Sequence, residues 1–141
     1  MGAWGFKNFE NDSAADFIYE IQDNGKSAVR DALLKIVNAK DTYIDASECE
    51  EALVSIELIA AAKGQPSDDL PEALQTWLVK NDVLSVRKSL FSKKIAMTSL
   101  AERALHIITS TSELKELWEE SESLDEWNAV QEDLHKRLLG T

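Results

Sequence analysis

Apolar residues recur along most of this chain at the spacing of one helix face. The clearest stripe lies within residues 26–39, where apolar positions alternate with charged positions that are expected to face water. The apolar positions of this stripe are Val29, Ala32, Leu33, Ile36 and Val37. An earlier stripe is formed by Ala14, Phe17, Ile18 and Ile21. It predicts a helix that ends at Asn24-Gly25, because glycine accepts the left-handed conformation of a helix stop.

One predicted helix is apolar almost all round. Residues 52–62 read ALVSIELIAAA, and a helix without a polar face is expected at the centre of a bundle, wrapped by the others. A capping box at Ser47-Glu-Cys-Glu50 predicts its start, and Gly64 predicts its end. In the connector before this helix, Tyr43 and Ile44 are expected to anchor on the core.

The second half of the chain carries shorter patterns of the same kind. Pro71 predicts the first turn of a fourth helix, which Asn81-Asp82 ends. Residues 85–90 and 95–108 have the pattern of two more helices or of one continuous helix. Capping boxes that begin at Ser110 and Ser123 predict the last two helices. No stretch alternates as a strand does. We therefore predict an all-α fold: a compact single-domain bundle of about six or seven short helices over residues 1–141.

An ordered N-terminal arm, residues 1–12, is expected to pack on this bundle. The arm and the helix after it bring aromatic, amide and acidic groups together: Trp4, Phe9, Glu10, Asn11, Asp12 and Asp16. In one hypothesis, the aromatic residues anchor a partner while the acids recognise a cationic group. In the other, Trp4 and Phe9 plug the open end of the bundle, and Asn11 and Asp12, or the capping box that begins at Ser13, cap the first helix. The structural hypothesis accounts for more of the pattern.

The net charge of −11 is unevenly distributed along the chain. Acids dominate residues 41–69 and 113–133, whereas residues 80–94 form a basic patch. Nucleic-acid binding is not expected, because phosphates must be neutralised by Lys and Arg. A basic protein partner suits this charge, and the candidate acidic surface is Glu113, Glu116, Glu119 and Glu120. The plainer interpretation of that surface is a solvated face around a buried Trp118.

A metal site is the next hypothesis that the sequence raises. Glu132-Asp-Leu-His135 has the Glu-x-x-His spacing of carboxylate di-iron bundles. Such a site needs a second motif, and the other histidine, His106, pairs instead with Glu102 at four residues' spacing. We expect no metal and no other cofactor.

Nucleophilic catalysis is not expected either. Cys49 lies between Glu48 and Glu50, which are expected to raise the pKa of its thiol, and no P-loop, dinucleotide fingerprint or nucleophile elbow occurs. We therefore expect no catalytic residue and favour a non-enzymatic interaction module, such as an immunity-like inhibitor or accessory protein. The alternative is a small-ligand-binding protein or hydrolase that uses carboxylates near the arm.

Several blocks of the chain, in order, resemble the bacterial domain of unknown function 4259 family. They are residues 1–5 (MGAWG), 9–12 (FEND), 15–17 (ADF), the alanine-rich stretch 51–64, residues 69–71 (DLP) and residues 112–120 (SELKELWEE). The resemblance covers essentially the whole chain. It implies a small, soluble, single-domain bacterial protein, and it implies no reaction, ligand or catalytic residue.

The cellular setting is expected to be the cytoplasm. A single cysteine cannot form an internal disulfide and fits a reducing compartment. No secretory apolar segment follows Met1, and the longest apolar stretch is too short and too charged to span a bilayer.

Overall fold

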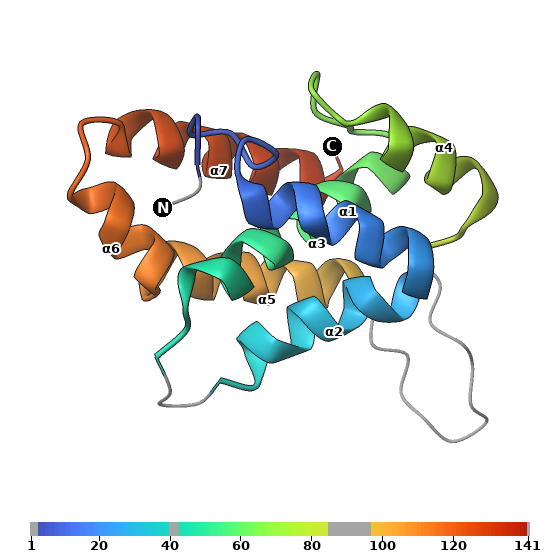
Figure 1. Ribbon diagram of the computed structural model, residues 1–141, viewed down its shortest axis with the longest axis horizontal. Coiled ribbons are helices and arrows are strands. Elements are labelled where there is room, and N and C mark those ends of the chain that lie inside the picture. The colour runs from blue at the N-terminus through green and yellow to red at the C-terminus, as the bar shows by residue number, and fades with distance from the viewer. Residues whose placement is uncertain (1–2, 40–42, 85–96, 141) are drawn as a thin grey trace.

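The computed structural model describes residues 3–39, 43–84 and 97–140, and these residues form an all-α bundle (Figure 1). The helices are α1 (Asp12–Asn24), α2 (Lys26–Val37), α3 (Ala46–Ala62), α4 (Glu72–Lys80), α5 (Met97–Ser110), α6 (Glu113–Glu119) and α7 (Leu124–Leu139). The predicted all-α fold is confirmed. The predicted helix at residues 85–90 lies outside the described residues.

Helix α3 occupies the centre of the bundle. It contacts α1, α2, α5, α6 and α7, so nearly its whole surface is covered by other helices (Figure 1). This environment explains why residues 52–62 are apolar on every face. Within residues 52–62, two polar side chains are nevertheless buried, Ser55 and Glu57, at 0% and 2% exposure. The Ser55 hydroxyl donates to the carbonyl of Glu51, one turn earlier, and Glu57 has partners outside the helix.

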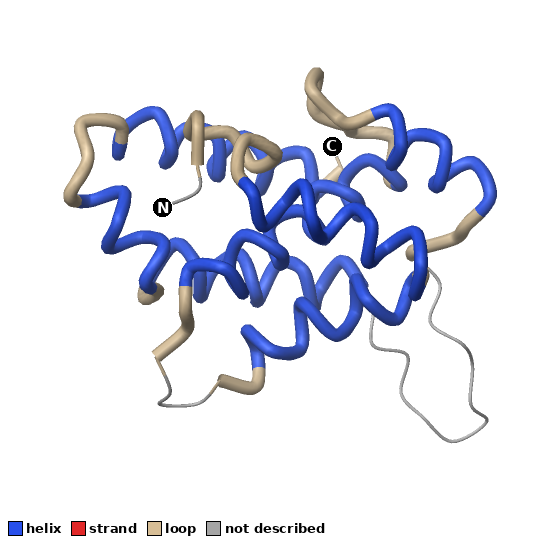
Figure 2. The backbone as a smooth tube through the Cα atoms, in the orientation of Figure 1, coloured by secondary structure: helices blue, strands red, loops and turns tan. Residues whose placement is uncertain are grey.

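The predicted helix ends agree well with the structure. Gly25 ends α1, as predicted, with a positive φ of +69° that glycine readily adopts, although its ψ of −149° lies outside the left-handed helical region. Helix α3 ends at Ala62, shortly before Gly64. The longest described stretches outside helices are the arm and the α3–α4 loop (Figure 2).

The predicted helix starts are less accurate. Of the three predicted candidates for the cap of α1, Asn11 is the one that the structure confirms: its side chain accepts from the amide of Ala14 at 2.7 Å. A residue whose side chain caps a helix typically has extended backbone, and Asn11 has it (φ −154°, ψ 160°), whereas Asp12 and Ser13 already lie within the helix.

At α3 and α6 the predicted cap is wrong. Asp45 caps α3 by accepting from the amide of Glu48 at 2.8 Å, so the predicted cap Ser47 lies inside the helix. Ser112 caps α6 by accepting from Lys115 at 3.1 Å, and the predicted cap Ser110 is the last residue of α5. At α7 the predicted cap position, Ser123, is correct, although its side chain makes no capping hydrogen bond.

The connector before α3 carries the two residues that were predicted to anchor on the core, and only one of them is buried. Ile44 is buried, as predicted, but Tyr43 is 62% exposed and donates its hydroxyl to Glu116 instead. Tyrosine can take this position because its hydroxyl finds a polar partner at the surface. None of the helices in the described ranges combines the length and the apolar character that crossing a membrane requires.

Candidate functional site

The N-terminal arm folds back on itself before α1 begins. Ala3 and Asn11 form an isolated antiparallel β-bridge, and the amide of Trp4 donates to the carbonyl of Glu10 at 3.0 Å. Gly5 faces the carboxyl end of the Glu10 side chain, which would have to shift to make room for a Cβ atom at this position.

Of the two aromatic residues predicted to plug the bundle, only Phe9 packs against the core. Trp4 is 63% exposed, so the prediction that it plugs the bundle is wrong; the arm's turn leaves its side chain in solvent. Phe9 is partly buried against the core, as is Phe6. Of the acids, Glu10 is half-buried and accepts from the amide of Lys7, whereas Asp12 and Asp16 are exposed on α1.

Asn8 binds the arm to the bundle, a role that the sequence did not reveal. It is only 3% exposed, and its Nδ2 donates to Glu57 Oε2 at 2.8 Å and to Gln131 Oε1 at 3.2 Å. Its Oδ1 accepts from Gln131 Nε2 at 2.8 Å. These bonds join the arm to α3 and to α7 through fully paired amide groups.

Arg137 extends this buried polar network to a charged pair. Its Nη1 lies 2.9 Å from Glu57 Oε1 and its Nη2 lies 3.3 Å from Oε2, a two-pronged contact. Its Nε donates to Asp133 at 2.7 Å, and Nη1 also donates to the carbonyl of Gln65 at 3.2 Å. Burial by itself lowers the pKa of Arg137, but its bonds to Glu57 and Asp133 outweigh burial and raise that pKa. The guanidinium therefore stays charged.

A cavity of about 520 Å³ lies between the arm, the α3–α4 loop and α7, and we call it the arm cavity. Its apolar lining consists of Phe6, Pro66, Ala129 and Val130, and its polar lining of Lys7, Asn8, Glu57, Ser67, Asp68, Asp69, Glu126, Asp133 and Arg137. Glu10, Asp12 and Asp16, the carboxylates singled out from the sequence, are not among these residues. The carboxylates that line this cavity are thus contributed by α3, the α3–α4 loop and α7.

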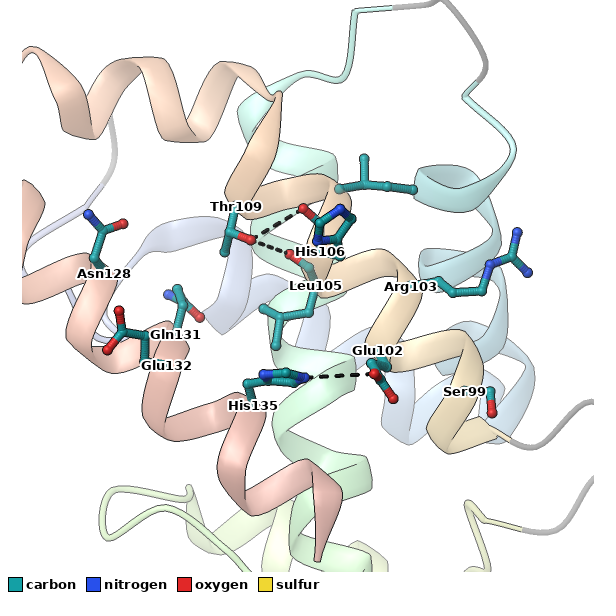
Figure 3. Close-up of a pocket in the computed structure, with 11 residues that line it drawn as sticks. Ser99, Glu102, Arg103, Leu105, His106, Thr109, Asn128, Gln131, Glu132 and His135 are labelled. Carbon is teal, nitrogen blue, oxygen red and sulfur yellow. Dashed lines mark hydrogen bonds and ion pairs between the residues drawn. The ribbon is translucent and has the colours of Figure 1, made fainter.

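A second groove of about 750 Å³ lies between α5 and α7 (Figure 3). The four residues considered for a metal site all line it: Glu102, His106, Glu132 and His135. His135 Nε2 lies 3.8 Å from Glu102 Oε1 across the groove. His106, however, lies beside Thr109 rather than beside His135 (Figure 3). In the part of the chain that the structure describes, no three His, Cys, Asp or Glu side chains come together as a metal site.

Helix α6 presents the acidic surface that the sequence singled out. Glu116, Glu119 and Glu120 are exposed, while Trp118 is buried behind them. Glu113 has a structural role, since its Oε1 accepts from the amide of Ala46 at 2.8 Å and so holds the start of α3.

The pKa of the exposed Tyr43 is sensitive to the negative charge of this surface. The hydrogen bond to Glu116 raises the pKa of Tyr43 to about 12, and the charges of Glu116, Glu113 and Glu120 add to that effect. The basic residue within α6, Lys115, directs its ammonium to the carbonyl of Ser110 at 3.4 Å. In the described residues no ion pair neutralises Glu119 or Glu120.

The thiol of Cys49 is buried at the centre of the bundle. Burial raises its pKa to about 12, with a smaller contribution from the charges of Asp45 and Glu48. The expected rise in pKa is confirmed, although burial rather than the neighbouring acids is its main cause. A thiol that stays protonated at neutral pH is a poor nucleophile.

The fold and these sites define a small all-α protein with a central apolar helix, on which a buried polar network anchors an N-terminal arm. The chain belongs to the family described as domain of unknown function DUF4259, whose model matches residues 2–130. The resemblance seen in the sequence is therefore confirmed. No curated protein and no solved structure matches this chain.

Proposed function

We propose that this protein is a non-enzymatic helical interaction module that binds a basic protein partner, as an inhibitor or accessory protein does. The observation that carries the proposal is the exposed acidic face of α6, formed by Glu116, Glu119 and Glu120. Carboxylates that no described residue neutralises attract a positively charged partner and speed its association. The buried, protonated thiol of Cys49 supports the non-enzymatic part of the proposal.

The rigidity of this face also favours recognition. Trp118 packs beneath it, Ser112 caps its helix, and Glu113 ties it to the start of α3. Charged groups on a fixed helix lose little conformational freedom when a partner binds. Tyr43 adds an exposed aromatic ring, held by Glu116, of the kind enriched at protein interfaces.

Capture of partners from the protein's own host tests the proposal. The tagged protein is compared with the variant Glu119→Lys/Glu120→Lys and with Glu20→Lys/Asp23→Lys, which changes the charge equally on α1. We expect the wild type and the α1 variant to retain one basic protein that is released as salt rises, and the α6 variant to lose it. Equal loss from both variants, or a complex insensitive to salt, would contradict the proposal.

A second candidate function is small-ligand binding near the arm, and the arm cavity is the observation that favours it. Its volume of about 520 Å³ lies within the range of small-molecule sites. In the hydrolase version of this candidate, catalysis would depend on Glu10, Asp12 and Asp16, which do not line that cavity. We therefore favour binding over hydrolysis for this site.

A further inference from the structure

We propose that the arm cavity binds an alkylammonium group, as carried by a linear aliphatic diamine. This inference rests on the second candidate function, ligand binding, and is independent of the acidic face of α6. Four features carry it: the volume of the cavity, its apolar wall, the sign of its charge and the rigidity of its floor.

The wall of the cavity suits a short methylene chain with a cationic end. Phe6 is partly buried against the core, and Pro66, Ala129 and Val130 provide further apolar surface around it. Apolar walls with a few placed polar groups are typical of small-molecule sites. An aromatic ring also attracts an ammonium group placed over its face.

The charge of the cavity selects a cation over an anion. Asp68, Asp69 and Glu126 are exposed carboxylates of its lining, and Lys7 is not ion-paired to any of them within the described residues. Arg137 does not offset them, because Glu57 and Asp133 already bind its guanidinium. A phosphate or carboxylate ligand would therefore meet uncompensated negative charge, whereas an ammonium would be attracted.

The floor of the cavity is held in place before any ligand arrives. Asn8 fixes the arm wall to Glu57 and Gln131, and Arg137 fixes the start of the α3–α4 loop through the carbonyl of Gln65. The cavity walls thus come from three parts of the chain that one buried network joins. A site formed in advance spends less binding free energy on ordering its own groups.

Titration with 1,4-diaminobutane at constant ionic strength tests the proposal, followed by the NMR signals of the side-chain amides of Asn8 and Gln131. We expect saturable shifts with one site, and no such shifts with glutarate, an anion of similar length. Nα-acetyl-lysine methylamide is the second probe, because a lysine of a partner protein would present the same chemistry. Saturation by either probe supports an alkylammonium site, and the stronger probe identifies its source. Saturation by neither probe overturns the proposal.

Variants of the lining make the test specific to this cavity. Asp68→Asn/Asp69→Asn keeps the shape of two exposed residues, and we expect it to weaken binding about tenfold. Lys7→Gln removes the competing charge and should strengthen binding. Glu20→Gln/Asp23→Asn makes the same change in net charge on α1 and should leave binding unchanged. Equal weakening by the α1 variant would show that the diamine responds only to the net charge of the protein, and this result would overturn the proposal.

One more variant separates this inference from the α6 proposal. Glu119→Lys/Glu120→Lys should bind 1,4-diaminobutane as the wild type does, whatever its effect on capture of a basic protein. Loss of diamine binding in this variant would contradict the assignment to the arm cavity.

Discussion

Asn8 is the residue through which the arm is bound to the helices, and its amide takes part in three buried hydrogen bonds. We expect Asn8→Ala to lower the free energy of unfolding by about 2 to 3 kcal/mol. The substitution leaves both polar groups of the Gln131 amide without their partner, and it removes the hydrogen bond to one Glu57 oxygen. Urea unfolding measures the loss.

Asn24→Ala is the matched control for this change. Asn24 is exposed at the end of α1, so its truncation should alter stability by no more than about 0.5 kcal/mol. Similar losses in the two variants would show that the network contributes little to stability.

Tyr43 gives a residue-level prediction about pH. In Glu116→Gln, we expect the phenol to titrate nearer its ordinary pKa of 10.0 than the value of about 12, because its main perturbing partner has lost its charge. Since the folded pKa is raised, the contribution of this hydrogen bond to stability is complete below about pH 10 and is lost as the pH rises through about 12.

Absorbance of the phenolate measures this titration, in a Tyr19→Phe background that leaves Tyr43 as the only tyrosine. An unchanged midpoint in Glu116→Gln would show that the acidic face does not govern Tyr43.

At the scale of the elements, the cap of α3 provides a direct comparison of two neighbouring residues. Asp45→Ala should cost about 1 kcal/mol, because it removes the acceptor for the amide of Glu48. Ser47→Ala should change stability by less than about 0.5 kcal/mol, because Ser47 is exposed inside the first turn. Thermal or urea unfolding of both variants checks the pair, and a larger loss from Ser47→Ala would restore the cap predicted from the sequence.

The helices themselves could be predicted because their signal is local. A stripe such as Val29, Ala32 and Leu33 repeats within a few residues, and Gly25 marks its own turn. The caps were harder, because Asn, Asp and Ser crowd each helix start. Which of them takes extended backbone is decided by the path of the preceding connector.

The arm network lay beyond the reach of sequence patterns. Glu57, the charged residue within the nearly apolar stretch 52–62, was the available signal, since a buried carboxylate requires a partner. That partner, Arg137, is 80 residues away, and Asn8 is 123 residues from Gln131. No spacing rule connects such pairs, because the tertiary packing of α3 against α7 brings them together. The prediction that Trp4 is buried was wrong for the same reason, because the position of its side chain depends on where the arm turns.

At the scale of the whole molecule, the arm is a structural part of the fold and a wall of its cavity at once. The partly buried Phe6 and Phe9 contribute apolar contact, while Asn8 supplies the specific hydrogen bonds. Ligand binding in the arm cavity and docking of the arm are therefore expected to stabilise each other, since a ligand that binds only the docked form shifts the equilibrium toward it.

Removal of residues 1–10 tests this dual role and leaves the cap Asn11 in place. We expect the free energy of unfolding to fall by about 3 to 5 kcal/mol, from the lost burial of two phenylalanines and the unpaired groups around Glu57. Trp4→Ala alone should cost no more than about 0.5 kcal/mol, because the indole is 63% exposed.

Urea unfolding of the full chain, the truncated chain and Trp4→Ala measures these differences. The same truncation should abolish saturable binding of 1,4-diaminobutane, because it removes Phe6 and Asn8 from the lining of the cavity. A truncated chain as stable as the full one would show that the arm is free to serve recognition alone. If Trp4→Ala instead cost as much as the truncation, the exposed indole would have to be buried in solution, and the arm would pack through its aromatic tip rather than through Asn8.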